Sequence, residues 1–196
     1  MRRNLHNLGT DAEGATAVEF ALASPVLVLL LMGLFDMGYS VYANTMLQGA
    51  LQRAARDSTV EGAASTLTVL DDAVKSEVLR VVPDASIAFS RKAYANFTDI
   101  GLEEDYTDAN ENGVCDDGEP YEDANGSGTW DRDRGANGLG GARDAVVYTA
   151  TMTYDRKFPM ASLIGLSETV TNSASTVLRN QPYDAQKSRA KLGNCT

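Results

Sequence analysis

An apolar run near the start of the chain is followed by a helical pattern that continues well beyond it. Residues 20–35 carry no charge, and the segment from Ala15 to Phe35 is 21 residues long. As a helix this segment would measure about 31 Å, which matches the hydrocarbon core of a bilayer. The pattern therefore predicts one membrane-spanning helix over residues 15–36.

Beyond this run, apolar residues return at spacings of three and four. These positions are Tyr39, Tyr42, Ala43, Met46, Leu47, Ala50, Leu51 and Ala54. Such spacing places them on one face of a helix. We therefore expect the membrane helix to continue over residues 37–64, ending near Gly62, with this face packed against a folded domain.

The remaining periodic segments predict a head domain over residues 65–196. Leu67 to Val82 has the spacing of a helix that Pro83 ends. Ile87 and Phe89 alternate with polar neighbours, as in a short strand. Two longer strands, rich in β-branched and aromatic residues, are predicted over 144–155 and 167–178, with a turn or short helix between them over 158–166.

The predicted fold class is therefore α+β. A long N-terminal helix, half membrane-spanning and half periplasmic, is expected to pack on a small antiparallel sheet that forms the head domain.

The negative charge of the chain is concentrated in one segment. The net charge is −10, and residues 99–144 contain 14 acidic residues against three arginines. A surface of this kind repels nucleic acid and attracts cations. We treat residues 99–144 as an acidic insert in the head domain and expect no nucleic-acid partner.

Part of the acidic insert has the spacing of a calcium-binding loop. Residues 108–119 match the template D-x-[DN]-x-[DN]-G-x5-E, with Gly113 at the sharp turn. Oxygen ligands without histidine favour calcium over zinc or copper. A solvated acidic loop is the alternative, but clustered carboxylates repel each other without a cation. The predicted ligands are Asp108, Asn110, Asn112, the main-chain carbonyl of Val114, Asp116 and Glu119.

A second, less complete loop begins fifteen residues later. Gly128 stands at its turn, but Arg134 replaces the final glutamate. We therefore expect a weaker calcium site, or one that borrows a ligand such as Asp133. The two loops are too close in sequence to form two helix–loop–helix units. The predicted ligands of the second loop are Asp123, Asn125, Ser127, Thr129 and Asp131.

Both cysteines, Cys115 and Cys195, follow the apolar segment. An even pair in an exported domain suggests a disulfide, with two free thiols as the alternative. A disulfide would tie the C-terminal part of the chain to the first calcium loop.

The leader, residues 1–14, decides the expected topology. Arg2 and Arg3 precede the apolar run, so the positive-inside rule leaves the N-terminus in the cytoplasm and the rest of the chain outside it. A cleaved secretory signal peptide is the alternative. The apolar run is long for a signal peptide, and Asp11 and Glu13 are unusual in its charged region.

Glu19 interrupts the apolar segment, where a carboxylate costs a few kcal/mol and is a functional hypothesis by default. Gly14, four small or apolar residues, Glu19 and Phe20 together resemble the processing site of prepilins. The run EFALASPVLVLLLMGLFDMG resembles the TadE-like proteins of tight-adherence pili. Residues 145–183 resemble the end of that family, except that Gln181 stands where glutamate is usual.

The resemblance implies that a prepilin peptidase cuts between Gly14 and Ala15 and that the apolar helix is kept as an assembly element. The new ammonium of Ala15 would pair with Glu19 of a neighbouring subunit, which relieves the cost of a charge in lipid. The alternative for Glu19 is a residue at the headgroup boundary.

The predicted function is a minor pilin or pseudopilin subunit in the bacterial inner membrane, with its head in the periplasm and, after assembly, on the pilus. Its expected partners are the prepilin peptidase, other pilin subunits, inner-membrane lipid and a surface receptor. The alternative is an unprocessed, membrane-tethered calcium-binding adhesion protein. An enzyme is not expected, because the only histidine is His6 and no Gly-x-Ser-x-Gly or phosphate loop occurs.

Overall fold

The computed structural model describes residues 13–58, 67–158, 160–163, 165–180 and 190–196. The chain divides into two units. The smaller unit combines residues 1–42 with 155–170, and the larger unit combines residues 43–154 with 171–196.

Helix α1 extends from Glu13 to Ser58 and contributes to both units. It is long and apolar enough to cross a membrane, as the sequence predicted. The helix begins two residues before the predicted start and continues through Pro25. Its predicted end near Gly62 lies outside the described residues.

The two parts of α1 have opposite environments. In the smaller unit its apolar side chains are exposed, and Leu22, for example, is 75% exposed. In the larger unit the helix buries one continuous face, formed by Ala43, Leu47, Ala50, Leu51, Ala54 and Ala55. The predicted stripe is confirmed from Ala43 onward, except that Met46 is only half-buried and that Ala55, which was not predicted, is buried. Tyr42, which the stripe included, is 55% exposed.

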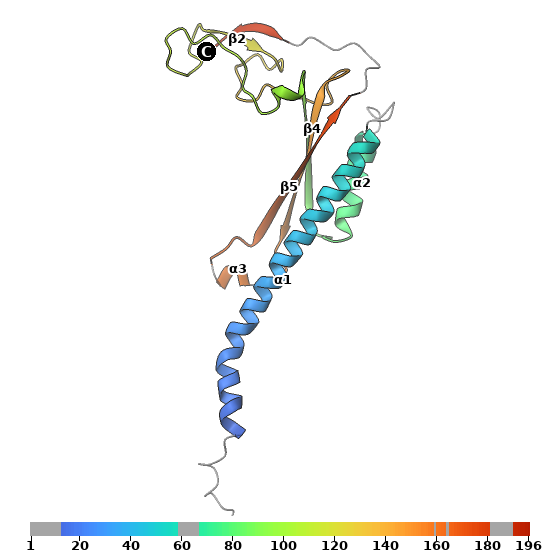
Figure 1. Ribbon diagram of the computed structural model, residues 1–196, viewed down its shortest axis with the longest axis vertical. Helices are drawn as coiled ribbons and strands as arrows, with labels where there is room; N and C mark the ends of the chain where they lie inside the picture. Colours follow the sequence, from blue (N-terminus) through green and yellow to red (C-terminus); the bar gives the residue numbers. More distant parts are fainter. Residues whose placement is uncertain (1–12, 59–66, 159, 164, 181–189) are drawn as a thin grey trace, which may run out of the picture. The chain divides into compact units, whose positions relative to one another are not determined.

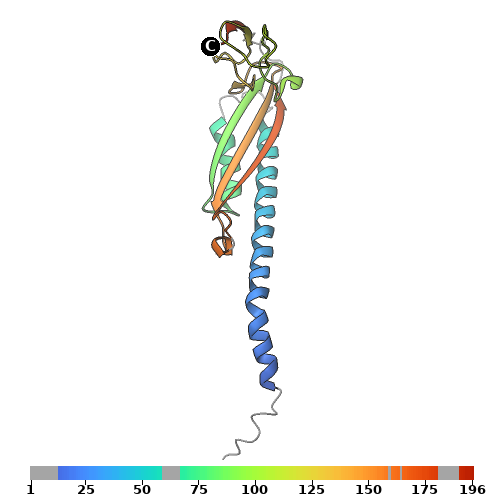
Figure 2. The same cartoon turned by 90° about the vertical axis from the view of Figure 1, so that its left-hand side faces the viewer.

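The larger unit is built on a four-stranded sheet of order β3-β1-β4-β5. Strand β1 pairs antiparallel with both β3 and β4. Helix α2, Leu67–Leu79, and the last part of α1 lie against one face of this sheet (Figures 1 and 2). The strands are β1 (Ser86–Tyr94), β3 (Ala136–Asn137), β4 (Ala145–Asp155) and β5 (Thr169–Arg179). The α+β class and the antiparallel sheet are thus confirmed.

Strand β4 supplies much of the core. Its side chains alternate along the strand, as they must where one face is buried. The buried ones on this face are Val146, Tyr148, Ala150, Met152 and Tyr154, and Ala145 at the start of the strand is buried as well. Helix α2 contributes Val74 and Val78, which are 1% and 0% exposed.

A polar cluster also links α2 to the sheet. Asp71 of α2 forms an ion pair with Arg91 of β1 and accepts a hydrogen bond from the Tyr148 hydroxyl. The Arg91 guanidinium lies 4.1 Å from the centre of the Tyr148 ring. Burial raises the pKa of Tyr148, and the hydrogen bond to Asp71 raises it further. The phenol therefore stays protonated and keeps donating to Asp71.

Several element ends differ from the predictions. Helix α2 ends at Leu79 instead of Val82. The N–H groups of Val81 and Val82 both donate to the Val78 carbonyl, which forms a turn before Pro83. The connector between β4 and β5 contains one short helix, α3, Met160–Leu163. The sequence did not predict the 3-10 helix η3 (Phe97–Asp99) or the strands β2 (Pro120–Asp123), β3 and β6 (Lys191–Asn194).

Replacing Val74 by alanine should lower the free energy of unfolding by about 2 kcal/mol, because two buried carbon groups are lost and a cavity remains. The matched control is Val69→Ala in the same helix, since Val69 is 61% exposed. Both changes give the same gain in helix propensity. The difference between the free energies of unfolding of the two variants therefore isolates the contribution of burial in the core. Denaturant unfolding of the full chain in detergent measures it, and equal stabilities would contradict this packing.

Candidate metal centre

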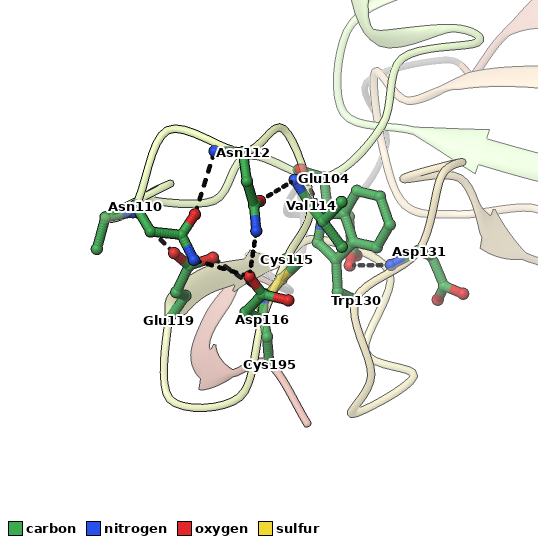
Figure 3. Close-up of a disulfide and its surroundings, with 11 residues drawn as sticks. Glu104, Asn110, Asn112, Val114, Cys115, Asp116, Glu119, Trp130, Asp131 and Cys195 are labelled. Carbon is green, nitrogen blue, oxygen red and sulfur yellow. Dashed lines mark hydrogen bonds between the residues drawn. A yellow bond between two sulfur atoms is a disulfide. The ribbon is translucent and has the colours of Figure 1, made fainter.

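The acidic insert folds into two loops at the end of the sheet where β1 ends and β4 begins (Figure 1). In the first loop the side chains of Asn110, Asn112 and Asp116 form hydrogen bonds with one another and with the loop's main chain (Figure 3). The Asp108 carboxylate accepts hydrogen bonds from the N–H groups of Asn112 and Gly113, at 3.1 and 2.7 Å. Asn110 Oδ1 accepts from Asn112 N–H at 3.1 Å, and Asn112 Oδ1 accepts from Val114 N–H at 2.8 Å.

Asp116 and Glu119 complete the first loop. Asp116 Oδ2 accepts hydrogen bonds from the side-chain amides of Asn110 and Asn112, at 2.9 and 2.6 Å. These two bonds lower the pKa of Asp116, so its carboxylate is anionic at neutral pH. Glu119 is 6% exposed, and its carboxylate accepts hydrogen bonds from the N–H groups of Ala109 and Asp116, at 2.8 and 3.0 Å.

The second loop repeats this pattern position by position. Asp123 accepts from the N–H groups of Ser127 and Gly128, at 3.0 and 3.1 Å, as Asp108 does at the corresponding positions. Asp131 Oδ2 accepts from the Asn125 amide and the Ser127 hydroxyl, at 2.9 and 2.7 Å. These bonds lower the pKa of Asp131, as their counterparts do for Asp116. Gly113 and Gly128 both have positive φ, 77° and 82°, at the sixth position.

Glu104 takes the role in the second loop that Glu119 has in the first. In the first loop the second and ninth N–H groups donate to Glu119. In the second loop these N–H groups, of Ala124 and Asp131, donate to Glu104 at 2.9 and 3.0 Å. Glu104 is fully buried, with 0% exposure. The carboxylate that the loop's own sequence lacks is therefore supplied by a residue that precedes both loops.

Asp133, the ligand that the second loop was expected to borrow, contacts strand β1 in this structure. The Asp133 carboxylate forms an ion pair with Lys92 and accepts from the Tyr94 hydroxyl at 2.8 Å. Burial opposes its ionisation, but these bonds together hold the pKa of Asp133 below its ordinary value. Arg134, at the position of the missing glutamate, instead reaches the Asp105 carboxylate at 3.2 Å.

The main chain of Glu104, like its side chain, is hydrogen-bonded to the second loop. Glu104 N–H donates to the Asp131 carbonyl at 3.0 Å, and Trp130 Nε1–H donates to the Glu104 carbonyl at 2.8 Å. The Trp130 ring packs edge-on against Tyr106, with centroids 5.5 Å apart. These contacts hold the buried carboxylate at a fixed place beside the loop.

A short strand joins the two loops, and a disulfide links the first loop to the C-terminal segment. Strand β2 begins directly after Glu119 and ends with Asp123, so it connects the last ligand position of one loop to the first of the next. Strand β6 pairs with β2. Cys115 and Cys195 form a disulfide, with their Cα atoms 5.6 Å apart. The Cys195 N–H also donates to the Glu119 carbonyl at 2.8 Å, so the C-terminal strand is fastened to the first loop.

The donor set fits calcium better than a transition metal. Within the described part of the chain, no three carboxylate, imidazole or thiol side chains gather to hold a metal ion by themselves. Each loop instead carries separate carboxylates, spaced along the chain, with amide, hydroxyl and main-chain oxygens between them. Calcium takes six to eight such oxygen ligands, whereas zinc selects four nitrogen and sulfur ligands.

The predicted processing site lies at the start of α1. Gly14, Ala15, Glu19 and Phe20 are all exposed in the first turns of the helix. Ala15 and Glu19 are four residues apart and so lie on the same helical face. The rest of the predicted leader, residues 1–12, lies outside the described residues.

Replacing Glu104 by glutamine should lower the free energy of unfolding by about 1–3 kcal/mol even without metal, because one acceptor oxygen becomes a donor amide facing main-chain N–H groups. Its neighbour Glu103 is exposed, so Glu103→Gln is the matched control. Thermal unfolding in the presence of a chelator measures both variants. Identical midpoints would show that Glu104 is not held by these donors.

Residues 14–56 match the family model of the TadE-like proteins, and the match begins at Gly14. No curated protein and no solved structure matches the chain. The match does not extend to residues 145–183, where the resemblance stays a prediction. The family consists of structural, pilin-like proteins associated with tight-adherence pili. The similarity of this chain to TadE-like proteins therefore covers residues 14–56, which is most of helix α1.

Proposed function

We propose that this chain is a structural subunit of a pilus or secretion pseudopilus, made as a membrane-inserted precursor and assembled after its leader is removed. The observation that carries the proposal is the TadE-like match over the exposed apolar part of α1. A helix of this kind has one role before processing and another after it. It anchors the precursor in the inner membrane, and after processing it packs against the helices of neighbouring subunits.

Glu19 favours the association of this helix with another subunit. Its side chain is exposed among apolar residues such as Val18 and Phe20, which are 59% and 66% exposed. In lipid an unpaired carboxylate is costly, so a partner charge on another subunit stabilises the assembled state. Cleavage after Gly14 would supply that charge as the new ammonium of Ala15. The prepilin peptidase is then the first partner of the chain, and other pilin subunits are the next.

We further propose that both loops of the acidic insert bind calcium and thereby stabilise the larger unit. The supporting observation is the repetition of one hydrogen-bond pattern in two loops. In the first loop Glu119 would be the two-oxygen ligand, and in the second loop Glu104 would be. Calcium would offset the negative charge that the carboxylates of each loop place in this segment. The stabilised surface would then serve as a contact for other subunits or for a receptor.

The processing proposal is tested by N-terminal sequencing and intact-mass measurement of the protein from its native membrane, with and without the prepilin peptidase. The expected mature form begins at Ala15 and disappears when the peptidase is removed, because the cut lies between Gly14 and Ala15.

Two other results would contradict processing. A chain that still begins at Met1 would favour a membrane-tethered calcium-binding adhesion protein. A start beyond Phe35 would mean that an ordinary signal peptidase had released a secreted domain.

The calcium proposal predicts that excess calcium raises the unfolding temperature of the larger unit. At a calcium concentration one hundred times the dissociation constant, each site should add about 2.7 kcal/mol. Glu119→Gln should remove most of the gain from the first loop. Asp117→Asn changes the same net charge at an exposed position outside the ligand set and should keep the gain.

Titration of the full chain in detergent, followed by thermal unfolding with calcium or chelator, measures these effects. An unfolding temperature that does not depend on calcium would reject calcium binding, and it would leave the pilin proposal intact.

A further inference from the structure

A single arginine, Arg156, joins the two ends of the connector between β4 and β5, which is residues 156–168. The Arg156 N–H donates to the Glu168 carbonyl at 2.8 Å, and Arg156 Nε–H donates to the Ser167 carbonyl at 2.9 Å. The Arg156 guanidinium also forms an ion pair with Asp36 of α1. One side chain therefore joins the two ends of the connector and attaches them to the helix, all within the smaller unit.

This attachment lies where the apolar segment of α1 ends. Asp36 is the first charged residue after the uncharged run of residues 20–35, and it is 8% exposed. One residue earlier, Phe35 stacks on Phe158 of the connector, with ring centroids 6.4 Å apart. The ion pair and the ring contact together fix the position of the connector along the helix.

The composition of the connector is unusual for a loop that faces water. Residues 158–166 contain no charged residue. Leu166 is 52% exposed, and on α1 nearby Leu34 and Met37 are 67% and 69% exposed. Connecting segments normally run over the surface with polar side chains. Here exposed apolar groups of the connector and of the helix occur together at one level of α1.

We propose that the connector lies in the interfacial region of the bilayer from which α1 emerges, so that lipid covers Leu166 and the outer face of Phe158. This inference rests on the proposal that α1 crosses the membrane. Its further support is continuity, because the exposed apolar surface of the connector adjoins the apolar surface of the span. An aromatic residue beside basic residues, here Phe158 after Arg156 and Lys157, is also typical of the membrane–water interface.

The inferred placement gives the Asp36–Arg156 pair a role. Each of these charges alone would be costly beside the hydrocarbon core, and the pair neutralises both. It would hold the turn between two strands of the sheet at the membrane surface. The larger unit would then be attached to the bilayer through the helix and also through the connector.

Tryptophan fluorescence of the full chain in lipid vesicles tests the inference. Trp130 is the only tryptophan of the chain, so the wild type gives a baseline and each variant adds one reporter. Leu166→Trp reports on the connector, Leu27→Trp on the middle of the span and Val177→Trp on strand β5 in the larger unit. The vesicles contain phosphatidylcholine and phosphatidylglycerol with bromine placed either near the headgroup or deep in the acyl chain.

The expected result is that Leu166→Trp adds fluorescence quenched about twofold more by shallow than by deep bromine. Leu27→Trp should be quenched more by deep bromine, and Val177→Trp by neither. Adding Arg156→Gln to Leu166→Trp should reduce the shallow quenching, because the connector is no longer fastened to Asp36.

Two outcomes would overturn the inference, and they are distinguishable. Unquenched Leu166→Trp beside deeply quenched Leu27→Trp would leave the membrane anchor intact and remove the connector from the bilayer; a blue-shifted emission in that case would mean that protein covers the connector. Absence of quenching in both variants would reject the membrane span itself, and with it the proposed function.

Discussion

One helix has to satisfy two different surroundings, and the rest of the structure depends on this constraint. From Ala43 onward α1 buries a face of small and branched residues in the larger unit. Before Tyr42 its apolar side chains point outward, and the connector covers only part of them. Exposed apolar surface of this extent is a mark of a membrane or of a partner. The change from one surrounding to the other falls close to Asp36, the first charged residue after the apolar run.

The acidic insert poses the opposite problem, since it concentrates charge in a small domain. Glu104, Glu119 and Asp123 are buried, and a buried carboxylate is costly unless it is paired. Main-chain N–H groups donate to each of these carboxylates, and the donors to Glu119 and Glu104 stand at the same two positions of their loops. The disulfide and the β2–β6 pair then fasten the ends of this segment. Proposed calcium would complete the neutralisation that these donors begin.

Long, periodic segments of the sequence predicted their structure well. The α+β class and strand β4 follow from spacing, because β4 and the last part of α1 each bury one face. The first part of α1 follows from its long uncharged apolar run. Strand β6 could not be predicted, since its four residues are mostly exposed and its order comes from pairing with β2. Glu104 was missed because the twelve-residue template examines only residues inside the loop. The Asp36–Arg156 pair joins residues 120 positions apart, which no local pattern reveals.

The proposed placement of α1 requires that the helix be in lipid up to about Asp36 and in protein from Ala43. Photolabelling of the full chain in bilayers with a lipid-borne diazirine, mapped by mass spectrometry, measures this directly. This placement predicts labels on α1 between Val18 and Phe35 and none between Ala43 and Ala55. Labels absent from the first range, or equal in both, would contradict it.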